Sequence, residues 1–135
     1  MRILLDADVL LDVALKRQAF LAASQDVLRW AEGEPGQAAV AWHTLSNIAY
    51  LTVSPREFIR ELLEFVEVAQ VGTEEARRAV GLPMSDLEDA LQAAAALAFE
   101  ATFVVTRNVR DYQKSPIPAL SPGDFLAKLG FKGPR

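Results

Sequence analysis

The sequence predicts a single α/β domain in three layers, with a central parallel sheet of four to five strands flanked by helices. Short apolar runs alternate with segments whose apolar residues recur at helical spacing. The first run, Ile3–Leu5, leads directly into a helix-like stretch, which is typical of a buried parallel strand. The chain has 135 residues, of which 51% are hydrophobic, and this suits one compact domain. We expect the domain to span residues 1–129 and residues 130–135 to form a loose tail.

The first half of the chain is expected to form two strands and four helices. Val9 and Val13 give the first helix an apolar stripe, and the turn residues 33–36 precede the second strand. Pro55 suits the first position of the fourth helix. The strands are expected at residues 3–5 and 38–41, and the helices at residues 8–16, 20–30, 44–51 and 55–66.

The second half is expected to form three strands and three helices. Gly81 and Pro83 stop the first of these helices, and Pro122 begins the last. The helix between them is rich in alanine. The strands are expected at residues 67–71, 102–105 and 118–120, and the helices at residues 73–80, 85–100 and 121–129.

Composition restricts the function. The net charge of -4 argues against a protein that holds nucleic acid by charge alone, although bound cations reverse the sign at an acidic site. With no cysteine and one histidine, any metal site must use oxygen ligands, which favours Mg²⁺ or Mn²⁺. We expect a cytoplasmic protein with no membrane partner, because no secretory signal is visible and residues 93–105, the most apolar stretch, are too few to cross a bilayer.

Two acidic residues follow the first strand. In open parallel sheets, ligands bind beyond the carboxyl ends of the strands. Asp6 stands at that place and is therefore the first candidate functional residue. Asp8 fits the N-cap of the following helix, so a structural role is expected for it.

A second acidic group begins the alanine-rich helix. Ser85 and Glu88 match a capping box, and Asp86 in the first turn suits the helix dipole. Asp89 instead shares a face with small residues, including Ala93. A carboxylate buried there needs a partner, which could be a metal ion or an arginine.

Two further polar groups follow strands. Thr106 and Asn108 come directly after the strand at residues 102–105, with Asp111 behind them, although Asn and Asp are also turn formers. After the second strand, Thr44 suits a helix N-cap and Asn47 lies one turn inside. The neighbouring His43 suits a packing or capping role better than that of a general base.

Clustered carboxylates almost without histidine favour a metal-ion mechanism. Mg²⁺ is bound through a few carboxylates, waters and the phosphate oxygens of a substrate, and it activates water for attack on phosphorus. The sequence therefore predicts phosphodiester hydrolysis.

These motifs resemble the PIN domain, the ribonuclease fold of VapC-type toxins in bacterial toxin–antitoxin pairs. The similar segments cover nearly the whole chain and lie at residues 4–12, 43–48, 86–94, 104–112 and 120–126. The resemblance implies a parallel sheet flanked by helices, a Mg²⁺ or Mn²⁺ cofactor, endonucleolytic RNA cleavage, homodimerisation and an antitoxin partner. It carries over Asp6, Asp89 and Asp111 as catalytic and metal-binding residues, with Thr106 and Asn108 in support.

The sequence departs from the family at Asn47, where the second motif usually supplies glutamate. Asparagine can bind a metal through its carbonyl oxygen or hold a water, but it brings no negative charge. This weakens the expected metal affinity, and Glu88 or Asp86 could supply the missing charge.

Three further expectations concern alternatives and substrate contacts. Asn47 supports the alternative of a PIN-like binding module with weakened catalysis. The Asp-x-Asp after the first strand also resembles haloacid-dehalogenase-like phosphatases, whose second motif is similar to Val105-Thr106. That family needs a later lysine and an acidic pair on a later strand, and here the chain offers Lys114 and Asp124 but little room for more sheet. The cations nearest the fourth motif, and therefore the candidates for RNA contact, are Arg107, Arg110 and Lys114.

Overall fold

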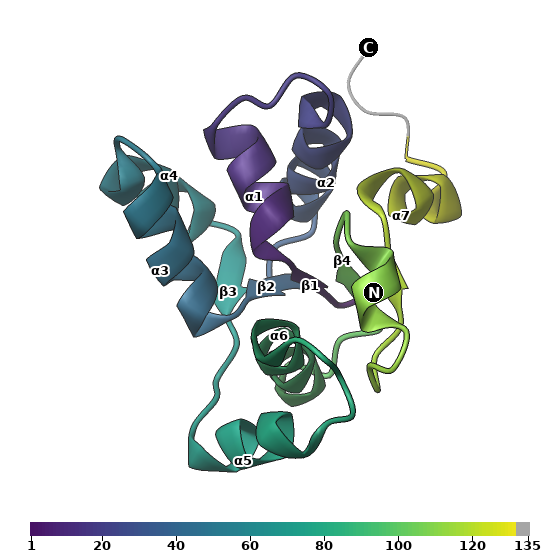
Figure 1. The fold of residues 1–135 in the computed structure, drawn as a ribbon. Coiled ribbons are helices and arrows are strands. Elements are labelled where there is room, and N and C mark those ends of the chain that lie inside the picture. The colour runs from purple at the N-terminus through teal and green to yellow at the C-terminus, as the bar shows by residue number, and fades with distance from the viewer. Residues whose placement is uncertain (132–135) are drawn as a thin grey trace.

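Five short parallel strands form one sheet in the order β3-β2-β1-β4-β5 in a computed structural model that describes residues 1–131 (Figure 1). The strands are β1 (Ile3–Leu5), β2 (Ala38–Val40), β3 (Val66–Val68), β4 (Phe103–Val105) and β5 (Ala119–Leu120). Leu5 pairs with Val40 on one side and with Val105 on the other. The residues that follow these three strands therefore meet at one edge of the sheet.

Helices cover both faces of the sheet, as predicted (Figure 1). They are α1 (Ala7–Ala14), α2 (Leu21–Gly33), α3 (Trp42–Leu51), α4 (Pro55–Leu62), α5 (Thr73–Gly81), α6 (Leu87–Ala98) and α7 (Pro122–Leu129), together with the short 3-10 helix η1 (Val109–Tyr112). Ile3 and Leu5 pack with α1, α2, α3, α4 and α7. Leu4 points to the opposite face and packs with α6. Alternate residues of a strand face opposite sides, which explains why the whole of β1 is apolar.

The alanine-rich composition of α6 allows it to lie close to two neighbours at once. Ala95 and Ala96 pack against the sheet. Ala90 and Ala94 pack against Ala79 of α5, which lies outside α6 (Figure 1). Helix α6 is therefore buried on both sides, as its sequence predicts.

Three predicted helix starts are wrong. The N-cap of α1 is Asp6 rather than Asp8, which lies inside the helix. Helix α3 begins at Trp42, so Thr44 is a buried residue of its first turn and no cap. The cap of α6 is Asp86, whose side chain accepts a hydrogen bond from the backbone of Asp89, rather than Ser85. For α1 and α6 two polar residues suit the cap, and the path of the backbone selects one of them. Helix α3 is instead preceded by Ala41, which has no capping side chain.

The boundaries at the third strand also differ from the prediction. Val66, expected as the end of a helix, is the first residue of β3, and α4 ends at Leu62. At the carboxyl end, Gly130 ends α7 with a φ of 68° and Phe131 packs against the core. The rest of the predicted tail, residues 132–135, lies outside the described part of the chain. Within residues 1–131, no helix combines the length and the apolar character needed to cross a membrane.

Candidate active site at the carboxyl edge of the sheet

Asp6 stands at the centre of the carboxyl edge and is 6% exposed. Its Oδ1 accepts hydrogen bonds from the backbone of Ala7 at 2.7 Å and from Gln92 Nε2 at 3.2 Å. Its Oδ2 accepts from Thr106 Oγ1 at 2.8 Å and from the Tyr112 hydroxyl at 3.1 Å. A carboxylate has about four acceptor positions, so these donors use the whole accepting capacity of Asp6.

Asp8 lies beside Asp6 and faces the fourth motif. Its Oδ2 accepts from the backbone of Arg107 at 3.0 Å and from Asn108 Nδ2 at 3.2 Å, and it lies 3.2 Å from Thr106 Oγ1. Its Oδ1 is buried and has no hydrogen-bond partner among the described residues. Burial, followed by repulsion from Asp6, raises the pKa of Asp8 to about 7. Asp8 is thus part of the site, which its reading as a helix cap missed.

Asp89 approaches the same place from α6. Its Oδ1 lies 3.4 Å from the hydroxyl of Tyr112, the residue that also binds Asp6. Partial burial, followed by repulsion from Asp86, Asp6 and Asp111, raises the pKa of Asp89 to about 6. The structure therefore brings two of the predicted catalytic carboxylates, Asp6 and Asp89, to one hydroxyl group.

Gln92 is a site residue that the sequence analysis missed. It is fully buried, and its Nε2 donates to Asp6 at 3.2 Å and to Thr44 Oγ1 at 3.0 Å. Its Oε1 is buried without a partner among the described residues. The available signal was a long polar side chain in an alanine-rich helix, one turn after Asp89.

Arg107 does not present a free cation to the site. Its Nε and Nη2 donate to the two oxygens of Asp12 at 2.7 Å and 3.0 Å, and its guanidinium lies 3.8 Å from the ring centre of Phe20. Asp12 is fully buried and also accepts from Ser24 Oγ at 3.2 Å, with Arg17 Nη1 at 3.5 Å. The interpretation of Arg107 as an RNA contact is corrected accordingly: its side chain anchors the fourth motif to α1.

The other candidates lie at the rim. Asp111, Arg110 and Lys114 are exposed and line a cleft of about 410 Å³. Asp111 is near enough to contribute to the raised pKa of Asp89, but it shares no hydrogen bond with Asp6 or Asp89 among the described interactions. The structure thus leaves it at the edge of the site.

The second motif places no acid at the centre. Asn47 is half-buried in α3, and Glu88 is exposed on α6. His43 has a buried Nε2 without a partner among residues 1–131, and burial lowers its pKa. A lowered pKa leaves this imidazole neutral near pH 7, as a packing histidine would be.

The donor set suits a hard cation such as Mg²⁺. Among residues 1–131, no group of three or more carboxylate or imidazole side chains is assembled to hold a metal ion, so the predicted set of Asp6, Asp89 and Asp111 is not brought together as three ligands. Mg²⁺, however, is usually held by one or two carboxylates and several waters. The unpartnered Asp8 Oδ1 and Gln92 Oε1 are oxygen atoms of the required kind. The residues fit such an ion, with Asp6 and Asp89 as its carboxylates.

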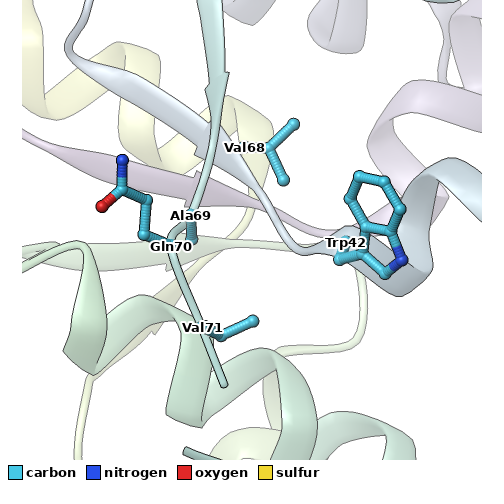
Figure 2. Close-up of a pocket in the computed structure, with 5 residues that line it drawn as sticks. All are labelled: Trp42, Val68, Ala69, Gln70 and Val71. Atoms are coloured by element: carbon cyan, nitrogen blue, oxygen red, sulfur yellow. The ribbon is translucent and has the colours of Figure 1, made fainter.

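A second hollow, of about 680 Å³, lies beside the edge strand β3, and none of the site carboxylates lines it. Val68 and Val71 point to the same side as Trp42, whereas Gln70 points away (Figure 2). Trp42 is 69% exposed. This apolar surface is a candidate for contact with another protein.

Comparison with known proteins agrees with this architecture. A family model described as PIN domain matches residues 2–110. The chain belongs to the PIN domain family. Because the chain belongs to this family, the alternative of a haloacid-dehalogenase-like phosphatase is excluded. PIN domains are generally nucleases.

A solved structure supports the fold. The chain is similar to a protein in the crystal structure of VapBC2 from Rickettsia felis bound to a DNA fragment from its promoter, with a TM-score of 0.65 and 16% identity. The similarity covers 90% of this PIN domain and 98% of the other chain. No curated protein matches the sequence significantly.

Proposed function

We propose that this PIN domain is a metal-dependent endoribonuclease that hydrolyses RNA phosphodiester bonds as the toxin of a toxin–antitoxin pair, acting in the cytoplasm. The observation that supports it most directly is the meeting of Asp6 and Asp89 at the Tyr112 hydroxyl, at the carboxyl edge of a parallel sheet. The fold similarity to a chain of the VapBC2 complex supports the toxin part of this proposal.

In this proposal Asp6 and Asp89 would hold Mg²⁺ or Mn²⁺, and the bound ion would activate water and neutralise charge on the phosphate. Thr106 orients Asp6 by its hydrogen bond of 2.8 Å, and Gln92 fixes the other oxygen. Asp111, at the rim of the site, would hold a water molecule near the metal, and Asn108 would support the acidic residues. Arg110 and Lys114, which line the rim cleft, offer positive charge to the RNA backbone.

Asp8 supplies the charge that Asn47 lacks. Burial, followed by repulsion from the neighbouring Asp6, raises its pKa, and one of its buried oxygens has no hydrogen-bond partner among the described residues. Glu88, the other candidate for this role, is exposed and takes part in none of the hydrogen bonds described above. Asp8 therefore replaces Glu88 in our account of the acidic site.

A protein partner is also part of the proposal. An antitoxin, or a second copy of the chain in a homodimer, could bury the apolar surface around Trp42 and Val71, which are 69% and 41% exposed. Exposed apolar patches of this kind mark interaction surfaces.

The test is cleavage of a labelled RNA by the purified protein with Mn²⁺, with Mg²⁺ and with EDTA. We expect cleavage that needs the metal and is lost in Asp6→Asn, whereas Asp26→Asn, a change at a partly exposed surface pair, retains it. Cleavage that is equal in Asp6→Asn and the wild type would refute the assignment, since it would come from a contaminant or another site.

The competing proposal is a PIN-like binding module without catalysis. It is favoured by the saturated hydrogen bonding of Asp6 and by the neutral Asn47. Calorimetric titration with Mn²⁺ separates the two. A module would show no heat of binding and no cleavage, while a nuclease shows both.

A further inference from the structure

We propose that the Tyr112 hydroxyl keeps the metal-free site closed by linking Asp6 to Asp89, and that it leaves Asp6 when a divalent cation binds. The inference rests on the proposed metal dependence and assigns Tyr112 as a positioning residue. Tyr112 is 2% exposed, and its hydroxyl lies 3.1 Å from Asp6 Oδ2 and 3.4 Å from Asp89 Oδ1.

The link joins three separate parts of the chain. Asp6 follows β1, Asp89 lies on α6 and Tyr112 ends η1. The ring of Tyr112 packs in the apolar cluster that contains Leu4 and Val104. Because packing fixes the ring, the hydroxyl is held at the point between the carboxylates.

The hydroxyl has one proton, which it shares between the two carboxylates. The shorter distance gives Asp6 the stronger hydrogen bond, and Asp89 accepts the longer arm of the shared bond. The hydroxyl therefore ties both carboxylates to one neutral donor.

Asp6 must lose a donor before it can ligate an ion, since its acceptor positions are all used. The Ala7 donor is part of the α1 backbone, and Gln92 is also tied to Thr44. Thr106 Oγ1 also accepts from the backbone of Asn108 at 3.0 Å. Within residues 1–131, the hydroxyl of Tyr112 makes hydrogen bonds only with the two carboxylates. It is the donor that can be displaced without breaking another part of the network.

A contact that is present only in the closed state weakens metal binding. Removing it destabilises the metal-free protein and leaves the loaded protein unchanged, so the affinity for the ion rises. Hydrogen bonds to charged groups are among the stronger ones. We expect Tyr112→Phe to bind Mn²⁺ about tenfold more tightly than the wild type.

The experiment is calorimetric titration of the full chain with Mn²⁺, comparing the wild type, Tyr112→Phe and Tyr50→Phe. Tyr50 is the other tyrosine of the chain and is 90% exposed, so its variant should match the wild type. Thermal melting in EDTA should show a lower Tm for Tyr112→Phe. Equal or weaker Mn²⁺ affinity in Tyr112→Phe would overturn the proposal, because the hydroxyl would then be neutral towards the ion or assist it.

A second measurement needs no variant. With two tyrosines in the chain, ¹³C labelling of tyrosine Cζ gives two NMR signals. The Tyr112 signal should shift on addition of Mg²⁺ and that of Tyr50 should not. A Tyr112 signal that stays in place in the Mg²⁺-bound protein overturns the proposed closure.

The titration and the cleavage assay together separate this inference from the proposed function. Equal Mn²⁺ affinities of the wild type and Tyr112→Phe, with intact Mn²⁺-dependent RNA cleavage, would refute the closure alone. Absence of both binding and cleavage in wild type and Tyr112→Phe would refute the nuclease as well.

Discussion

Replacement of Arg107 by glutamine should strongly destabilise the domain. Asp12 is fully buried, and Arg107 neutralises it through two hydrogen bonds, of 2.7 Å and 3.0 Å. Glutamine is shorter and neutral, so Asp12 would remain as a buried charge with weaker compensation. The backbone of Arg107 also binds Asp8 at 3.0 Å, so loss of the side-chain anchor loosens the fourth motif.

The magnitude follows from what remains around Asp12. Removing one partner of a buried ion pair costs about 3–5 kcal/mol. Ser24 and Arg17 stay in place, with Arg17 at a longer distance of 3.5 Å, so we expect the lower end, about 3 kcal/mol. For a chain of 135 residues this loss corresponds to a fall in Tm of roughly 10 °C.

The assay is urea unfolding followed by circular dichroism, with thermal melts alongside. Arg29→Gln is the matched control, because its pair with Asp26 spans 2.8 Å but Arg29 is half exposed, and such pairs contribute about 0–1 kcal/mol. The double variant Asp12→Leu with Arg107→Met should recover most of the loss, since the buried charge is gone. A cost below about 1 kcal/mol for Arg107→Gln would refute the reasoning, as that is the range of an exposed pair.

Three further outcomes are expected. Gln92→Leu removes one donor from Asp6 and should lower the free energy of unfolding by about 1–3 kcal/mol, measured by urea unfolding; a loss below about 0.5 kcal/mol would contradict it. Phe125→Ala should lower the free energy of unfolding by about 3–5 kcal/mol in the same assay, because Phe125 is fully buried with its ring centre 5.1 Å from that of Trp30. An unchanged urea midpoint would contradict the packing of Phe125 in the core. Burial raises the pKa of Asp8 from 3.8 to about 7, so its protonated form is favoured by folding. The stability that this protonated form contributes to the metal-free protein is complete below about pH 4 and is lost as the pH rises through about 7. Asp8→Asn cannot titrate, so its free energy of unfolding should decline less across this pH range.

Much of the fold could be predicted from local sequence, because the elements have local causes. Ile3–Leu5 is apolar throughout since it is buried on both faces, and the alanines of α6 reflect its two packed sides. The helix starts were less predictable. Asp6 and Asp8 both suit a cap, and so do Ser85 and Asp86, and the sequence does not say which one the backbone presents.

The contacts of the site, unlike the helices and strands, could not be predicted from local sequence, because its polar pairs form between distant parts of the chain. Gln92 and Asp6 are separated by 86 residues, Tyr112 and Asp6 by 106, and Arg107 and Asp12 by 95. The order of the strands brings these residues together, and no local pattern records their pairing. The sequence could therefore predict which carboxylates end at the sheet edge, but not which donors would satisfy them.

The charges at this edge connect the two proposals. Asp8 and Asp89 have raised pKa values mainly because burial and neighbouring carboxylates disfavour their ionised forms. Under the proposed metal dependence, a bound cation would take over the balancing of charge that protons and hydroxyl donors provide in the metal-free protein, and its binding would be coupled to proton release.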